Sequence, residues 1–162
     1  MKKNKPLLYD KDIAREFLVQ SNMIEDMNMG YAHDDAMKAW KYIVKVPKLS
    51  VASILRVHEL LMERINPRIA GKFRDCDIYI GGNKKKFFGK VFLEAQLNNW
   101  IVDMGKDPIK SHVDFEDIHC FEDGNGRVGR ILYNWHRLKS GLPLHVIHVG
   151  QEQFEYYKWF KK

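Results

Sequence analysis

The sequence has little of the chemistry that holds small secreted proteins together. Its 162 residues include two cysteines, Cys76 and Cys120, which are too few for a disulfide framework and form no Cys-x-x-Cys pair for zinc. No stretch stays apolar over the ~20 residues that a membrane-spanning helix needs. The basic start lacks the apolar stretch of a secretory signal, because charged residues interrupt it from Asp10 onward. These absences lead us to expect a cytoplasmic protein without a membrane segment.

The chain also lacks internal repeats, low-complexity segments and a linker rich in proline or serine. A length of 162 residues suits one domain with one core, so residues 1–162 are expected to form a single domain. The formal net charge of +6 favours acidic partners, such as nucleotides, acidic protein surfaces or nucleic acid. Charge alone does not choose among them.

Apolar residues recur at helical spacing along most of the chain, which predicts a mainly helical bundle. Ser50 is placed to cap one helix and Gly141 to end another. Ser111, followed three residues later by Asp114, predicts a capping box at the start of a short helix. The expected helices cover residues 12–26, 34–46, 50–62, 90–104, 111–118, 125–139 and 151–160.

One stretch departs from the helical pattern. Residues 73–80 end in Ile78–Ile80 and are followed by two glycines, which predicts a short strand or one arm of a β-hairpin. The following Lys84–Lys86 reads as a charged, solvated loop. The expected fold is therefore all-α, a helical bundle with one short β-hairpin.

The most informative segment is His119–Arg130, which reads His-Cys-Phe-Glu-Asp-Gly-Asn-Gly-Arg-Val-Gly-Arg. Gly124 and Gly126 allow tight backbone geometry and the close approach of a ligand. They lead into a helix whose first N–H groups lack intrahelical partners and, with the helix dipole, favour an anion. Arg127 and Arg130 lie three residues apart, so both can reach one side of that helix start. Two guanidinium groups there indicate polyphosphate rather than a single carboxylate.

Two further side chains of this segment suit phosphoryl chemistry. Asp123 offers hard oxygen atoms beside the phosphate site and suits Mg²⁺. The imidazole of His119 can take a proton from an attacking hydroxyl near neutral pH. Phosphoryl transfer needs mainly positioning, charge neutralisation and one base, and the segment combines all three. Taken one at a time, these features are also typical of an ordinary loop, a solvated helix face and a structural histidine.

The segment resembles the signature of the Fic (Fic/Doc) family, His-Pro-Phe-x-(Asp/Glu)-Gly-Asn-(Gly/Lys)-Arg-x-x-Arg. Every defined position matches except one, where Cys120 stands in place of proline. Proline fixes its backbone angle and cysteine does not, but proline contributes no reacting group, so activity is expected to remain. The flanking residues 115–118 and 131–134 also resemble the family, and a looser likeness extends from about residue 12 to the C-terminus.

The resemblance implies a Fic-like fold, a small helical bundle with a β-hairpin flap over the active site. It also implies transfer of AMP from ATP to a Ser, Thr or Tyr hydroxyl of a target protein. By analogy His119 is the general base, Asp123 holds Mg²⁺ against the α- and β-phosphates, Arg130 meets the γ-phosphate, and Phe121 anchors the loop in the core. The other phosphate-binding residues would be Gly124, Asn125, Gly126 and Arg127.

The flap would correspond to Lys72–Gly82. An exposed strand edge there can pair with an extended segment of the target and present its hydroxyl. The residues that would dock the target are Asp77, Ile78, Tyr79 and Ile80. A strand that only packs on the bundle is the other interpretation.

A second resemblance lies in residues 21–26, Ser-Asn-Met-Ile-Glu-Asp, which are similar to the inhibitory motif (Ser/Thr)-x-x-x-Glu-(Gly/Asn). The last position departs, because Asp26 replaces glycine or asparagine. Residues 11–30 would then form an N-terminal inhibitory helix segment, in which Glu25 takes the place of the γ-phosphate and pairs with Arg130. ATP bound beside it would have its α-phosphate misaligned for attack. The alternative is that Glu25 is a solvated helix carboxylate.

Other functions stay open at this point. The same site could remove AMP from a target, or transfer another phosphate-linked group such as UMP or phosphocholine. A function of another class is a basic module that binds protein or nucleic acid without catalysis, although nucleic acid is the less favoured partner. No membrane partner is expected, and the sequence leaves open the target protein, the nucleotide preference and whether the chain forms a homo-oligomer.

Overall fold

The chain folds mainly into helices, as its apolar spacing predicts. The computed structural model describes residues 8–161, so the lysines of the first seven residues lie outside it. Within this range a two-stranded sheet accompanies the helices, and no helix has the length and apolar character needed to span a bilayer. The elements are α1 (Lys11–Ile24), α2 (Gly30–Ile43), α3 (Val51–Met62), β1 (Ile78–Ile80), β2 (Asn83–Lys85), α4 (Lys90–Asp103), α5 (Pro108–Ile118), α6 (Asn125–Lys139) and α7 (Gln151–Lys158).

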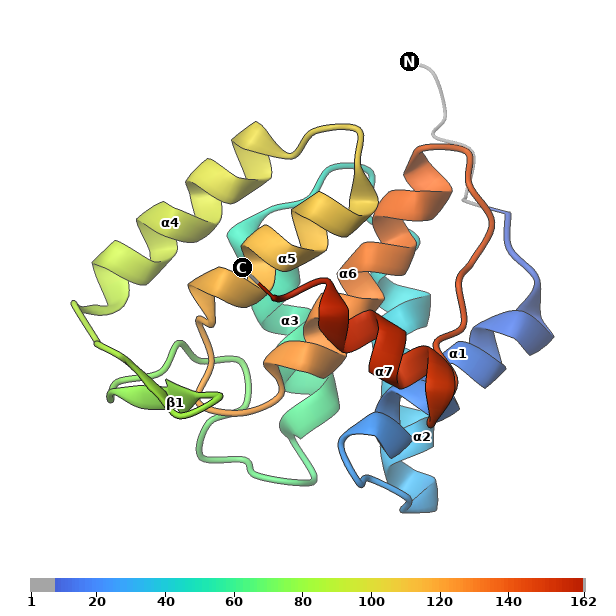
Figure 1. The fold of residues 1–162 in the computed structure, drawn as a ribbon, viewed down its shortest axis with the longest axis horizontal. Coiled ribbons are helices and arrows are strands. Elements are labelled where there is room, and N and C mark those ends of the chain that lie inside the picture. Colours follow the sequence, from blue (N-terminus) through green and yellow to red (C-terminus); the bar gives the residue numbers. More distant parts are fainter. Residues whose placement is uncertain (1–7, 162) are drawn as a thin grey trace.

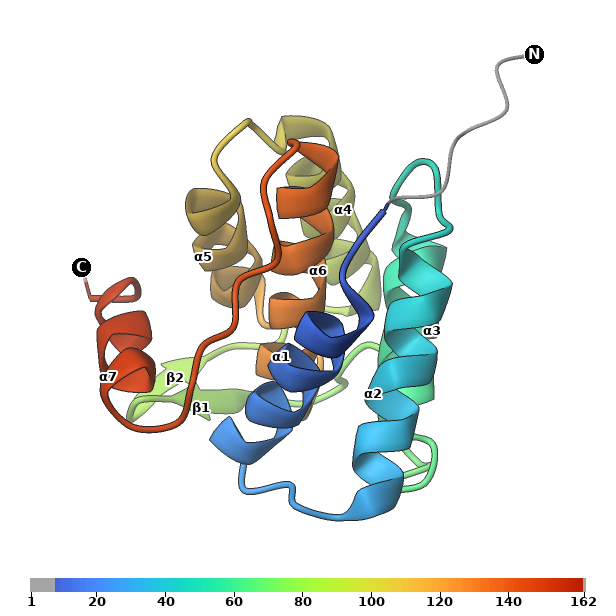
Figure 2. The same cartoon turned by 90° about the vertical axis from the view of Figure 1, so that its right-hand side faces the viewer.

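Helix α6 is the central element of the bundle. It packs against α5 on one side and against α1 and α3 on the other, while α2 covers α1 and α3, and α4 covers α5 (Figure 1 and Figure 2). Most of its residues are buried. A smaller cluster of Ile24, Ile147 and Tyr156 joins α7 to the end of α1. The first turn of α6 is therefore fixed by helices that are distant in the sequence.

The first turn of α5 begins earlier than the sequence suggests. The predicted capping box at Ser111 is wrong, because the helix starts at Pro108 and is capped by Asp107. The Asp107 carboxylate accepts hydrogen bonds from the backbone N–H groups of Ile109 and Lys110 at 2.9 and 3.2 Å. Proline suits the first helical position, since the N–H that it lacks would have had no partner there.

The β-hairpin lies at the end of the bundle where α6 begins (Figure 1). Its strands are antiparallel, with Ile78 opposite Lys85, and two glycines with positive φ, Gly81 and Gly82, form the turn. The expected charged loop at Lys84–Lys86 is wrong for its first two residues, which belong to β2. Lysines are tolerated there because the strand is exposed at the edge of a small sheet.

Trp40 of α2 is the largest fully buried side chain among the described residues and provides a test of the packing. It is fully buried, and the rings of Tyr9 and Phe17 meet it edge-on with centroids 5.4 and 5.0 Å away. We expect Trp40→Ala to lower the free energy of unfolding by about 3–5 kcal/mol, measured by urea denaturation. Phe88→Ala removes an exposed aromatic ring and should change it by no more than about 0.5 kcal/mol. Equal losses of unfolding free energy in the two variants would contradict the burial of Trp40 in the core.

Candidate functional site

The predicted motif occupies the loop between α5 and α6 and the first turn of α6. His119 follows α5 in the left-handed conformation, with φ of 48° and ψ of 59°, which is uncommon for a residue with a Cβ. Gly124 is also left-handed, with φ of 83°. A Cβ at Gly124 would lie 3.1 Å from the sulfur of Met62, so glycine also permits close packing there. These two reversals turn the chain so that α6 begins at Asn125, where the sequence predicts it.

The imidazole of His119 is oriented by its own helix. Its Nδ1 lies 3.2 Å from the backbone carbonyl oxygen of Glu116, which can only accept a hydrogen bond, so Nδ1 carries the ring proton. The other ring nitrogen, Nε2, then has a free lone pair. Burial lowers the pKa of His119 below its usual range, which keeps the ring neutral at pH 7. A partly exposed, neutral imidazole in this state can accept a proton.

The motif loop, residues 119–124, is braced from inside by Asn125 and Phe121. The Asn125 side-chain oxygen accepts a hydrogen bond from the Phe121 N–H at 3.0 Å, and its amide nitrogen donates to the Phe121 carbonyl at 2.9 Å. Phe121 is fully buried, which confirms that it anchors the loop in the core. Because the Asn125 side chain is engaged with the loop backbone, its group best placed for an anion is the N–H at the helix start.

His58 of α3 joins this loop to the rest of the bundle, and no local pattern in the sequence points to it. Its Nε2 donates to the carbonyl oxygen of Asp123 at 3.0 Å, while its Nδ1 accepts from the Gly71 N–H at 3.0 Å. Its ring stacks on Phe121 with centroids 3.8 Å apart. Burial lowers its pKa to about 4, so the neutral tautomer that both bonds require persists at pH 7. The loop is thus held in place although Cys120 replaces the usual proline.

Arg127 lies behind the loop and is almost fully buried. Its Nη2 lies 3.0 Å from the Met62 sulfur, a weak acceptor, and 3.9 Å from Asp123 Oδ2. Its Nε has no hydrogen-bond partner among the described residues. The first N–H groups of α6 lack intrahelical acceptors at the same helix start. This region, which we call the α6 recess, is electropositive and has unused donors, so it suits a phosphate group.

Arg130, one turn further along α6, already has acceptors. Its Nη2 donates to Glu25 Oε1 at 2.7 Å and to the Ser21 carbonyl at 3.0 Å. Its Nε donates to Ser21 Oγ at 2.8 Å, and its Nη1 donates to the Tyr156 hydroxyl of α7 at 3.3 Å. The ion pair between Arg130 and Glu25 that the sequence predicts is present. The bond to Tyr156 was not predicted, because the aromatic pattern of α7 indicates packing alone.

Glu25 is placed over the first turn of α6 by the end of α1, where it is the C-cap residue. Its carboxylate lies so close to Gly126 that a Cβ there would be 2.5 Å from Glu25 Oε1. Asp26, the next residue, is left-handed with φ of 56°. Glycine and asparagine adopt this conformation readily and aspartate tolerates it. The geometry thus explains the glycine or asparagine that ends the inhibitory motif, and why Asp26 can replace it.

The Asp123 carboxylate lies at the outer side of the α6 recess, with its side chain 61% exposed. Its Oδ1 accepts a hydrogen bond from the Gly124 N–H at 2.6 Å. An accessible carboxylate beside an anion site is the ligand type that Mg²⁺ takes together with phosphate oxygens and water. The position and chemistry of Asp123 therefore fit a divalent cation.

The β-hairpin is tied to His119 by Arg74, a buried residue that no motif marks. Its guanidinium donates to the backbone carbonyls of His119 and Cys76, both at 2.8 Å, and to that of Lys86 at 3.2 Å. Cys76 precedes β1 and Lys86 follows β2. Both ends of the hairpin are therefore fixed relative to the residue that carries the candidate base.

The four residues predicted to dock a target lie along and beside β1. Tyr79 is 70% exposed and Ile80 is also exposed. Asp77 also stabilises the hairpin, because its carboxylate pairs with Lys84 at 2.8 Å and accepts a hydrogen bond from the Phe87 N–H at 2.7 Å. Within the described sheet, β1 pairs with β2 along one edge only. The other edge has the exposed side chains that an added strand would contact.

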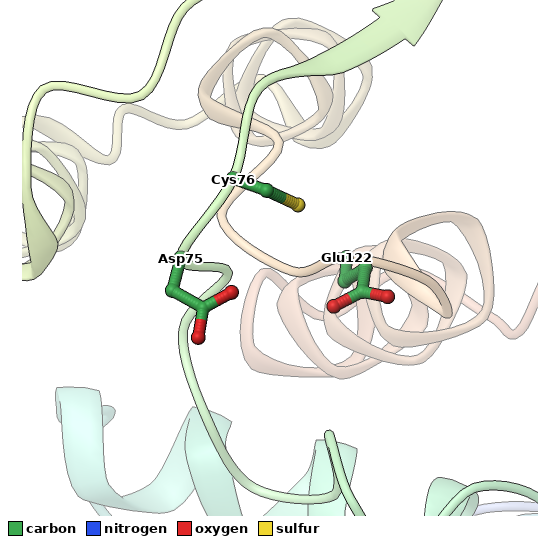
Figure 3. A group of neighbouring side chains, drawn as sticks. All are labelled: Asp75, Cys76 and Glu122. Carbon is green, nitrogen blue, oxygen red and sulfur yellow. The ribbon is translucent and has the colours of Figure 1, made fainter.

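A separate group of metal-binding atoms lies outside the α6 recess. Asp75, Cys76 and Glu122 bring their ligand atoms within 4.8 Å of one another, across the gap between the segment before β1 and the motif loop (Figure 3). Arg68 already pairs with Glu122. Because Arg68 neutralises the charge of Glu122 and the three residues lie near the surface, we assign no metal to this group.

Comparison with known proteins identifies the family. Residues 48–136, more than half of the chain, match the model of the Fic/DOC family. The chain belongs to the Fic/DOC family. Relatives of this Fic chain include the protein adenylyltransferase Fic of Drosophila grimshawi, 28% identical over 152 residues, and the protein adenylyltransferase fic-1 of Caenorhabditis briggsae, 33% identical over 122 residues. The alignments cover 88% and 68% of this chain, but only 31% and 23% of the two relatives.

Solved Fic structures share the fold of this chain. A Fic domain-containing signaling protein from Bacteroides thetaiotaomicron aligns over 91% of this chain and 70% of its own, with a TM-score of 0.74 and 18% identity. The Fic-1 fragment from Caenorhabditis elegans aligns over 93% of this chain and 58% of its own, with a TM-score of 0.73 and 19% identity. The predicted Fic-like architecture is confirmed.

The buried His58 makes the stability of this Fic fold depend on pH. Its pKa is about 4 in the folded chain against an ordinary value of 6.5, so the unfolded chain binds more protons between these values. The contribution of the buried, neutral His58 to the free energy of unfolding is fully present above pH 6.5 and is lost as the pH falls towards 4. His58→Gln should therefore reduce the loss of unfolding free energy between pH 7 and pH 5 by about 1–2 kcal/mol, measured by urea denaturation.

The control is His148→Gln. Hydrogen bonds to Glu16 and Glu152 raise the pKa of His148, so its removal should not reduce the loss at acid pH. A His58→Gln protein that loses as much free energy as wild type between the two pH values would show that His58 is not buried in its neutral form.

Proposed function

We propose that this Fic chain is a protein adenylyltransferase that moves AMP from ATP onto a hydroxyl group of another protein. One arrangement carries the proposal: a neutral His119 with a free Nε2 follows α5, beside the electropositive α6 recess. Relatives named protein adenylyltransferase support the same activity, although this chain spans less than a third of their length.

The α6 recess would bind the phosphates of ATP. The N–H groups of Asn125 and Gly126 and the guanidinium of Arg127 would take the α- and β-phosphates. Arg130, one turn further along the helix, would take the γ-phosphate.

Asp123 would hold Mg²⁺ against the α- and β-phosphates, for which its exposed carboxylate is suited. The hydrogen bond from the Gly124 N–H to Oδ1 would hold this carboxylate in place for the ion. When bound, the ion would neutralise charge on the phosphates.

In the transfer step, the target hydroxyl oxygen forms a bond to the α-phosphorus. The bond from that phosphorus to the oxygen that bridges it to the β-phosphate breaks, and pyrophosphate leaves. The hydroxyl proton moves to Nε2 of His119, while Nδ1 keeps its hydrogen bond to the Glu116 carbonyl and so holds the ring in place. The target chain would pair with the open edge of β1, beside Tyr79 and Ile80.

Glu25 would inhibit this transfer by using Arg130. A γ-phosphate cannot bind Arg130 in the same way while Glu25 Oε1 lies 2.7 Å from its Nη2. ATP would then bind with its α-phosphate out of line with the attacking hydroxyl, and small displacements of this kind slow a transfer strongly.

Labelling with ATP that carries the label on its α-phosphate tests transfer and inhibition together. In the presence of Mg²⁺, Glu25→Gly should increase protein-bound label at least about tenfold over wild type, because the γ-phosphate gains Arg130. Glu25→Gly/His119→Ala should show none, because the base is missing.

Glu63→Gly is the matched control, since Glu63 is the C-cap of α3 as Glu25 is of α1. It should label like wild type. Equal labelling of wild type and Glu25→Gly would support the transferase activity and contradict inhibition by Glu25. No label on the protein itself or on an added lysate would favour removal of AMP, another donor or a module without catalysis.

The metal role of Asp123 has its own test in the Glu25→Gly background. Asp123→Asn should lower labelling by about a hundredfold or more, and EDTA should abolish it, because a bound metal contributes several kcal/mol to such steps. Glu122→Gln is the control, since that carboxylate pairs with Arg68 instead. An Asp123→Asn protein as active as its parent would contradict the assignment.

A further inference from the structure

The side chain of Glu116 is largely buried and has no role in the proposed reaction. It lies in the last turn of α5, three residues before His119. Its side chain is 13% exposed, and its Oε1 accepts no hydrogen bond from the described residues. Burial raises its pKa to about 7. Burying such a carboxyl costs free energy. The groups that lie beside it therefore bear on its role.

The neighbour of this carboxyl is the candidate base. Glu116 Oε2 lies 4.0 Å from Nδ1 of His119. Nδ1 is the nitrogen that already carries a proton, and Nε2 is the one that receives the proton of the target hydroxyl. When Nε2 takes that proton, the ring becomes positive beside Glu116. Opposite charges at this separation attract strongly in a partly buried site.

Gly129 provides the space for the carboxyl. A Cβ at Gly129 would overlap Glu116 Oε1 and would lie 2.7 Å from Cε1 of His112. Gly129 stands at the second undefined position of the Arg-x-x-Arg part of the motif. The signature therefore does not require glycine there. In this chain, the missing Cβ of Gly129 on α6 leaves the space that the Glu116 carboxyl of α5 occupies.

Charged and titratable groups from every neighbouring segment surround Glu116 and His119. They are Glu25 after α1, Arg74 before β1, Lys85 of β2, His112 and Asp117 of α5, Cys120 of the motif loop, Arg130 of α6 and Tyr156 of α7. Arg130 favours the carboxylate form of Glu116, while Glu25 and Asp117 oppose it. Among these groups, Nδ1 of His119 lies 4.0 Å from Glu116 Oε2, so a positive charge on the ring would favour the carboxylate form of Glu116.

We propose that Glu116 is a positioning residue for the transfer step, whose carboxylate stabilises the imidazolium that His119 becomes when it accepts the hydroxyl proton. The inference rests on the proposed function, because it assigns a partner to the base of that reaction. No further reactant is needed. The hydroxyl proton moves to Nε2, and the proton of Glu116 exchanges with solvent before the step.

An NMR titration of the His119 ring tests the coupling without any turnover. In wild type, the ring signal should change in two steps as the pH rises, because a coupled pair titrates as a unit. Glu116→Gln keeps the size of the side chain and removes its charge, so the ring should titrate in one step with its pKa lowered by about one unit. Asp114→Asn removes an exposed carboxylate of α5 that pairs with Lys110, and it should change neither result.

Kinetics in the Glu25→Gly background tests the consequence for transfer. Glu116→Gln should lower the maximal rate about tenfold or more with little change in the KM for ATP, because only the charged transition state loses an interaction. The acid limb of the pH–rate profile should move to lower pH together with the pKa of His119. Asp114→Asn should leave both the rate and the profile of its parent unchanged.

Several results would overturn the proposal: a single titration step for His119 in wild type, an unchanged ring pKa in Glu116→Gln, or an unchanged maximal rate. If Glu116→Gln does not fold, the wild-type titration alone decides. A chain that transfers no AMP would refute the proposed function, whereas the titration would still decide whether Glu116 and His119 are coupled.

Discussion

The contact between Arg130 and the end of α1 is the interaction on which the rest of the site depends. A buried guanidinium needs acceptors, and Ser21 and Glu25 provide three of its four hydrogen bonds. This contact fixes the end of α1 over the first turn of α6, beside the Gly126 backbone. Any other anion that uses Arg130 has to compete with Glu25. The contact that satisfies Arg130 in the fold is therefore the same contact through which Glu25 is proposed to inhibit transfer.

The remaining site is held by side chains from distant parts of the chain. His58 of α3 fixes the motif loop through the Asp123 carbonyl, and Arg74 fixes both ends of the hairpin to the His119 carbonyl. Tyr156 adds a bond to Arg130 from α7. These contacts hold the motif loop from outside, which explains how Cys120 can stand where the family signature has proline. A loop braced in this way can hold the candidate base and the start of α6 in one geometry.

The sequence predicted those features that depend on local chemistry. The limits of α6 follow from its glycines, and the Glu25–Arg130 ion pair follows from two short motifs of the family. The start of α5 was missed because Ser111 and Asp114 imitate a cap, whereas Asp107 followed by proline is the real one. The strand at Lys84 and Lys85 was missed because pairing with β1, not composition, decides it. His58, Arg74 and Tyr156 act across long sequence separations, so no local pattern marks them.

The most direct test of the competition at Arg130 is a pair of crystal structures with Mg²⁺ and a non-hydrolysable ATP analogue, one of wild type and one of Glu25→Gly. We expect Arg130 to contact Glu25 in wild type, with the γ-phosphate elsewhere. In Glu25→Gly we expect Arg130 to contact the γ-phosphate, with the α-phosphorus open to attack from the side of His119. The same γ-phosphate contact with Arg130 in both proteins would contradict the idea that Glu25 occupies the place of that phosphate.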